Sequence, residues 1–108
     1  SLEEMFLVAQ TYEPGSKEFN EVFEIAVRMF PDDPTANLNV ACAMIESGLY
    51  DRAEAYLAKA GNLPEAVHAR GVMAARQGRE DEARRLFGQA GQAGVKAATE
   101  NLRLMDME

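Results

Sequence analysis

The side chains best suited to chemistry in this sequence are one cysteine and one histidine, Cys42 and His68. A catalytic thiol needs a base in contact with it and a third group that orients the base. Cys42 and His68 fall on the first helices of neighbouring predicted hairpins and could meet, but no orienting acid or oxyanion donor accompanies them. A zinc site needs three or four converging ligands. We therefore predict no enzyme, no metal and no cofactor, and expect Cys42 to be a small core residue.

Two other patterns that could carry chemistry have structural explanations. The run Glu80-Asp81-Glu82 stands at the start of a predicted helix, where carboxylates interact favourably with the helix dipole. The segment Gly91-Gln-Ala-Gly94 lacks the lysine and the spacing of a phosphate-binding loop. Neither pattern predicts a site.

Composition bounds the class of protein. The chain has 108 residues, of which 47% are hydrophobic, and a formal net charge of −7. It is long enough for one modest core, and the acidity argues against nucleic acid and against an anionic membrane surface. No stretch approaches the ~18 apolar residues of a membrane span, so we expect no membrane insertion by this segment. The acids are concentrated in residues 1–54, with 11 acidic and 3 basic side chains, against 7 and 8 in residues 55–108.

Hydrophobic periodicity predicts an all-helical chain of about seven helices. The other predicted helix pairs lie on either side of residues 34–60. These residues are predicted to form two antiparallel helices joined by a turn at Ser47-Gly48. The expected helices span residues 2–12, 17–30, the two halves of 34–60, 65–76, 81–90 and 95–106. Prolines and glycines separate them, notably at Pro14-Gly15, Gly61-Asn62 and Gln77-Gly78.

The second helix of each predicted hairpin carries a repeated apolar pattern. Inward positions recur with an internal spacing of four and then three residues: Phe19, Phe23 and Ala26, then Ala53, Leu57 and Ala60, then Ala83, Phe87 and Ala90. Small residues at the contact positions of two first helices, Ala41 and Gly71, also correspond, and Pro31 stands where such a unit ends.

This pattern resembles the tetratricopeptide repeat. The resemblance implies a right-handed α-solenoid of about three helical hairpins with a C-terminal closing helix, as a single domain within a longer protein. Its units would span about residues 1–33, 34–63 and 64–93, and the closing helix residues 95–106. The sequence departs from the repeat pattern at Phe19, at Asn37 and Val67, and at Arg70.

The resemblance also implies a ligand groove along the first helix of each unit. We call the following residues the candidate groove: Leu38, Asn39, Cys42, Ile45, Glu46, His68, Val72 and Arg76. The clamp that holds acidic C-terminal tails in some such domains would need cations and amides where this chain has Glu4, Val8, Glu65 and Ala69; only Asn39 matches. We therefore expect no binding of acidic tails, and an apolar or mildly basic peptide as the better partner.

Four short runs support a second resemblance, to the C-terminal repeat segment of OmpA-related surface proteins of Bacteroides-type bacteria. They are Tyr12-Glu-Pro-Gly15, Phe30-Pro-Asp-Asp33, Ala36-Asn37-Leu38-Asn39 and Glu100-Asn101-Leu102. This resemblance implies a location in the periplasm or outer membrane. Two functions stay open: a non-catalytic protein-interaction or scaffold module, and a structural spacer of a larger envelope protein with an empty groove.

Overall fold

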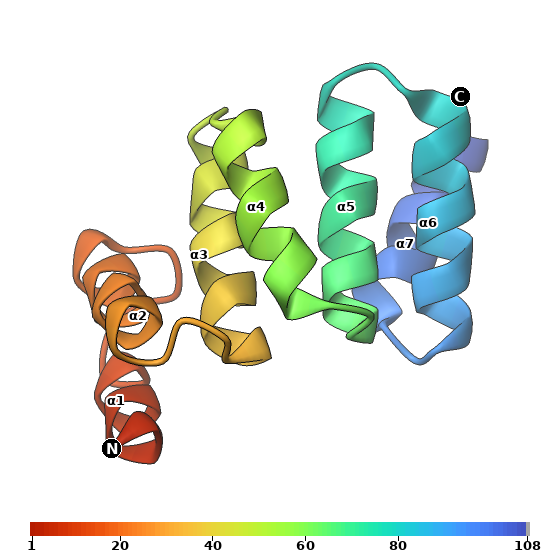
Figure 1. Ribbon diagram of the computed structural model, residues 1–108. Coiled ribbons are helices and arrows are strands. Elements are labelled where there is room, and N and C mark those ends of the chain that lie inside the picture. Colours follow the sequence, from red (N-terminus) through yellow and green to blue (C-terminus); the bar gives the residue numbers. More distant parts are fainter. Residues whose placement is uncertain (108) are drawn as a thin grey trace. The chain divides into compact units, whose positions relative to one another are not determined.

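The computed structural model describes residues 1–107, and these residues form seven helices and no strand (Figure 1). The helices are α1 (Leu2–Ala9), α2 (Lys17–Met29), α3 (Pro34–Glu46), α4 (Tyr50–Ala60), α5 (Pro64–Arg76), α6 (Glu80–Gln92) and α7 (Lys96–Asp106). The prediction of an all-helical chain with about seven helices is confirmed.

The helices group into two compact bodies. The N-terminal body, Ser1–Gly61, contains α1 to α4, and the C-terminal body, from Asn62 onward, contains α5 to α7. Within each body, helices that follow one another in the sequence pack together, most extensively in the pairs α3–α4 and α5–α6. This neighbour-to-neighbour packing is consistent with a helical repeat.

Two predicted helix boundaries differ from the structure by more than one residue. The first helix ends at Ala9 rather than at residue 12, because the next amides turn back onto the carbonyl oxygens of Val8 and Ala9. The sixth helix continues through Gly91 to Gln92, and only Gly94, with φ 102°, ends it. A glycine inside a helix costs about 1 kcal/mol relative to alanine, which packing against a neighbour can offset. The first glycine of the segment, Gly91, therefore did not predict where this helix ends.

Three helix ends share one turn. After α3, α5 and α6, a glycine with positive φ is followed by a residue whose N–H reaches back to the helix. The bonds run from Leu49 to Met44, from Arg79 to Ala74 and from Val95 to Ala90, at 2.8–3.0 Å. This is the Schellman arrangement, which satisfies carbonyl groups left without partners at a helix end. It produces the short turns that bring α4, α6 and α7 back alongside the preceding helix.

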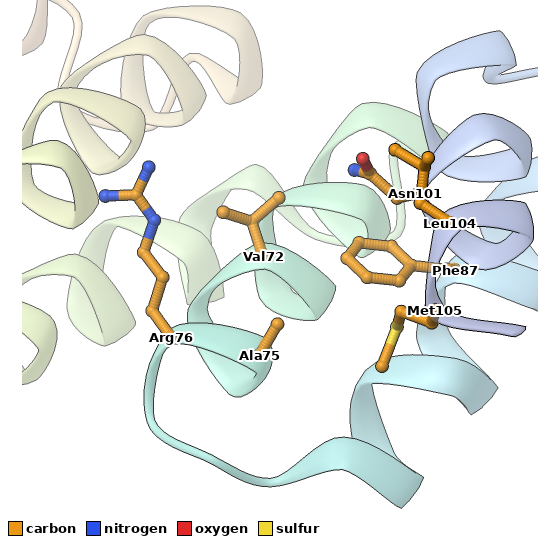
Figure 2. A pocket seen from close by; sticks show the side chains of 7 residues that line it. All are labelled: Val72, Ala75, Arg76, Phe87, Asn101, Leu104 and Met105. Atoms are coloured by element: carbon orange, nitrogen blue, oxygen red, sulfur yellow. The ribbon is translucent and has the colours of Figure 1, made fainter. Parts of the chain in front are cut away.

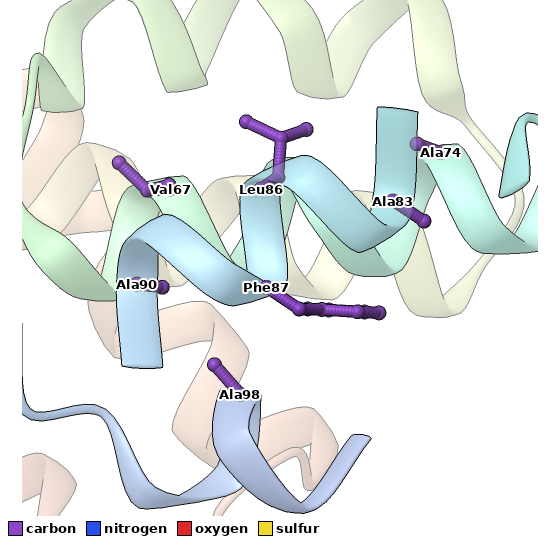
Figure 3. Close-up of a cluster of buried hydrophobic side chains, with 7 residues drawn as sticks. All are labelled: Val67, Ala74, Ala83, Leu86, Phe87, Ala90 and Ala98. Carbon is purple, nitrogen blue, oxygen red and sulfur yellow. The ribbon is translucent and has the colours of Figure 1, made fainter. Parts of the chain in front are cut away.

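The core of the C-terminal body combines four alanines with two aliphatic side chains and one aromatic ring (Figure 3). Its buried members are Val67, Ala74, Ala83, Leu86, Phe87, Ala90 and Ala98. A Cβ atom at Gly71 would lie 2.7 Å from the ring of Phe87, so only glycine lets α5 approach α6 this closely. The predicted contact role of Gly71 thus has a direct physical reason.

The N-terminal body has an aromatic core where its first hairpin packs. The ring centroids of Phe6 and Phe23 are 5.6 Å apart, and those of Phe19 and Phe23 are 4.9 Å apart. Ala9 and Val40 complete the buried cluster. Of the nine predicted inward positions of the second helices, eight are buried and Phe19 is half-buried.

Asn37 is the one buried polar residue among those the structure describes. Its amide nitrogen donates to the carbonyl oxygens of Pro31 at 2.9 Å and Asp33 at 2.8 Å. The Asp33 side chain accepts from the Ala36 amide at 2.8 Å and so caps α3. Asn37 therefore fastens the connection from α2 to the first turn of α3, a role that its sequence position alone did not indicate.

A candidate binding pocket in the C-terminal body

A pocket of about 290 Å³ opens between α5, α6 and α7 (Figure 2). Its walls are mostly apolar and come from all three helices: Val72, Ala75, Arg76, Phe87, Asn101, Leu104 and Met105. Phe87 also belongs to the buried core, so the floor of the pocket is held rigidly by core packing. Leu104 is 47% exposed and lies at the solvent edge. The size suits one apolar side chain of a partner rather than a whole cofactor.

His68 lies on the same helix as Val72, one turn earlier, and contacts α7. Its Nε2 is 3.1 Å from the side-chain nitrogen of Asn101, and its ring centroid is 5.6 Å from that of Phe87. With Nε2 accepting from the Asn101 amide, the ring is neutral and carries its proton on Nδ1. Burial lowers the pKa of His68 below its usual value, which keeps the ring neutral at physiological pH.

The C-terminal part of the candidate groove is therefore only partly available to a partner. Val72 and Arg76 line the pocket, and Arg76 is exposed, with its guanidinium directed away from Phe87 (Figure 2). His68 is half-buried and faces α7. The sequence pattern placed these three residues on one helix but did not show that α7 borders the same pocket.

The N-terminal part of the candidate groove lies along α3. Leu38 and Asn39 are half-buried, and the Asn39 amide nitrogen donates to the Thr35 carbonyl oxygen at 2.9 Å. Glu46 is exposed. Ile45 is only 2% exposed, so its side chain stabilises the body but offers almost no surface to a ligand. The groove as one continuous surface stays a prediction, since its two parts belong to different bodies.

Cys42 is exposed, and the expectation that it is a core residue is wrong. Cys42 and the buried Ala41 are adjacent on α3 and point in different directions, because successive helix residues are turned by about 100°. The protein around the thiol removes enough water to raise the pKa of Cys42, and the nearby Glu46 carboxylate raises it further. The thiol is thus protonated at neutral pH, the opposite of an activated nucleophile.

Several pocket residues were missed by sequence reasoning as binding residues. Phe87 was predicted only as an inward apolar residue, and neither Leu104 nor Met105 was assigned to a binding site. Asn101 appeared only within a short run of the second resemblance. Asn101 lies three residues after Ala98 in α7, on the same face, so the helical period of α7 was the available signal.

Comparisons with protein-family models, with curated proteins and with solved structures found no match. Across residues 1–107 there is no cluster of three or more His, Cys, Asp or Glu side chains that could hold a metal ion. In the same range no helix is both long and apolar enough to cross a membrane.

Proposed function

We propose that the chain is a helical-repeat module of the tetratricopeptide kind, with the right-handed solenoid path that such repeats share. Support comes from two successive hairpins, α3–α4 and α5–α6, that share 13-residue first helices and the same glycine turn. Their second helices bury the same three positions: Ala53, Leu57 and Ala60 in one, and Ala83, Phe87 and Ala90 in the other. Repetition at this level of detail favours a repeat over an unrelated bundle.

The proposed function is non-catalytic binding of a protein or peptide segment. The observation that carries it is the pocket between α5, α6 and α7, with a rigid apolar floor and polar groups at Asn101 and Arg76. An apolar side chain of a partner would fill the pocket while the partner backbone meets the polar groups. The raised pKa of Cys42 also favours a binding role over nucleophilic catalysis.

The test is peptide selection followed by pocket blocking. Short random peptides displayed on phage would be selected on the protein, and their affinities compared with two variants. Ala75→Phe places a ring in the pocket, and Ala97→Phe makes the same change at an exposed position of α7 outside the pocket. Selected peptides should carry an apolar anchor residue. Their affinity should fall about tenfold or more for Ala75→Phe and should be unchanged for Ala97→Phe.

Two results would contradict the proposal. One is a set of selected peptides that binds both variants as well as the unaltered protein. The other is a set dominated by acidic C-terminal tails, since Glu4 and Glu65 stand where such a clamp needs cations.

The alternative is a structural spacer in a larger cell-envelope protein, and one contact favours it. The hydrogen bond between His68 and Asn101 shows that a candidate groove residue is already engaged by the chain's own closing helix. In a spacer the pocket would stay empty, and selection would return no peptide that depends on Ala75. The envelope location rests on the second sequence resemblance, and cell fractionation of the source organism would test it.

A further inference from the structure

The first hairpin has a second apolar surface besides its core, which we call the α1–α2 ledge. It consists of Met5 and Val8 of α1 and Val22, Ile25 and Met29 of α2. Between the two helices lies a pocket of about 350 Å³, lined by four of these residues together with Ser1 and Glu4. Val22, Ile25 and Met29 follow one another at helical spacing, so they form one continuous stripe.

Three of the five ledge residues are exposed, and Met5 and Val22 are half-buried. Val8 is 48% exposed, Ile25 43% and Met29 58%. The core of the hairpin is formed by Phe23 with the rings of Phe6 and Phe19, and Val22 packs against this core while it also lines the pocket. A contiguous apolar surface with a hollow at its centre marks an interaction site more often than scattered exposed residues do.

The charges around the ledge select the partner. Residues 1–30 contain six acidic and two basic side chains. Glu4 lines the pocket, and Glu18 lies one turn before Val22 on the same stripe. Of the two cationic side chains, Lys17 pairs with Glu21 at 4.0 Å and Arg28 is the other, and the N-terminal ammonium of Ser1 lies 3.9 Å from the Glu4 carboxylate. The surface therefore presents apolar area bordered by negative charge.

From these observations we propose that the α1–α2 ledge binds a basic amphipathic helix of a partner protein. A third helix placed against two neighbouring helices can set apolar residues at spacings of three and four into the hollow. Its lysine or arginine side chains would then meet Glu4 and Glu18 at the border, which accelerates association and selects the partner's sign of charge. A second copy of this chain fits less well, because it would bring the same carboxylates against one another.

The probe is a fluorescent peptide of leucine and lysine that forms an amphipathic helix, titrated by anisotropy. One control peptide has the same composition in an order without an apolar face, and another carries glutamate in place of lysine. The protein should bind the amphipathic lysine peptide about tenfold or more tightly than either control. Binding should weaken with added salt, because the border charges are exposed.

Matched variants assign the binding to the ledge. The double change Val8→Ser and Ile25→Ser should abolish the preference for the amphipathic peptide. Leu49→Ser changes an apolar side chain of similar exposure (42%) outside the ledge, and should leave binding unchanged. Glu18→Gln leaves every apolar contact in place and should weaken binding at low salt only.

Four outcomes would overturn the proposal. The first is equal binding of the three peptides, and the second is full binding by the double serine variant. A third is loss of binding with Leu104→Ser instead of the double serine variant. This result would place the peptide in the C-terminal pocket, which supports the proposed function and excludes the ledge as the binding site. The fourth is a concentration-dependent dimer in sedimentation that Ile25→Ser dissociates, which would make a second copy the occupant.

Discussion

The hairpins α5–α6 and α1–α2 solve the same packing problem differently. In α5–α6 a glycine faces a phenylalanine ring, and three residues connect two 13-residue helices. In α1–α2 an eight-residue helix is joined to a 13-residue helix through seven residues, and three phenylalanine rings fill the contact. The first hairpin also leaves Val8, Ile25 and Met29 exposed, whereas α5 buries six of its residues.

The difference teaches what small residues do in this chain. Where Gly71, Ala74 and Ala83 stand at the contact, the helices approach closely and apolar side chains on both are covered. In the first hairpin, Phe19 stands at the position that corresponds to Ala53 and Ala83, and it is half-buried. The short α1 also cannot cover the full length of α2. The uncovered part of α2 contributes the stripe of the α1–α2 ledge.

The largest expected effect comes from removing the central ring of the C-terminal core. Phe87→Ala should lower the free energy of unfolding by ~3–5 kcal/mol, because it leaves a cavity against Gly71 that the helix backbones cannot fill. Phe23→Ala should cost less, since Phe6 and Phe19 can move into the space. Urea titrations followed by circular dichroism measure both, and equal losses would contradict the contrast between the hairpins.

A pair of glycine substitutions tests close approach directly. Gly71→Ala should destabilise by ~1–3 kcal/mol through overpacking, reduced by the better helix propensity of alanine. Gly88→Ala, on α6 with nothing within 4 Å of an added Cβ, should stabilise by up to about 1 kcal/mol. Thermal unfolding of the two variants shows whether each substitution raises or lowers the stability. A stabilising Gly71→Ala would remove the close-contact explanation.

The turn glycines should show a smaller contrast. Gly78 has φ 79° inside the Schellman turn, so Gly78→Ala should cost about 1–2 kcal/mol. Gly15→Ala, at φ 85° in the longer connection of the first hairpin, should cost less, because that connection can change conformation without breaking such a turn. Melting temperatures of the two variants would decide, and a larger loss for Gly15→Ala would reverse the expected order.

The smallest effect is a pH dependence confined to the C-terminal body, which holds the only histidine. Burial lowers the pKa of His68 from its usual 6.5, so the unfolded chain binds the proton more tightly than the folded one. Stability is therefore complete above about pH 6.5 and falls as the pH drops from there toward the lowered pKa of the folded state. The free energy of unfolding would be measured at pH 7.5 and at pH 5.5 for the unaltered protein and for His68→Gln. The difference between the two pH values should be smaller for His68→Gln. An identical pH response in both proteins would exclude His68 as its source.

Local sequence determined the helices, most of their ends and the inward positions of the second helices. These features depend on neighbours a few residues away: a glycine that tolerates positive φ, a capping Asp33 or Ser16, and an apolar side chain every three or four positions. The predicted inward residues from Ala53 to Ala90 are accordingly buried. The early end of α1 was missed because the apolar stripe continues past Ala9 although the backbone turns.

Tertiary packing decided which apolar and polar positions are covered. Cys42 and Ile45 lie three residues apart on the same helix, yet one is exposed and the other buried, because cover depends on how neighbouring elements cross α3. The contact of His68 with Asn101 joins residues 33 positions apart. The pocket that α7 completes likewise joins side chains of α5 and α7 that are distant in the sequence. Helical periodicity defines faces around one axis, whereas a site of this kind depends on the distance between axes, which is set only when the side chains of several helices pack together.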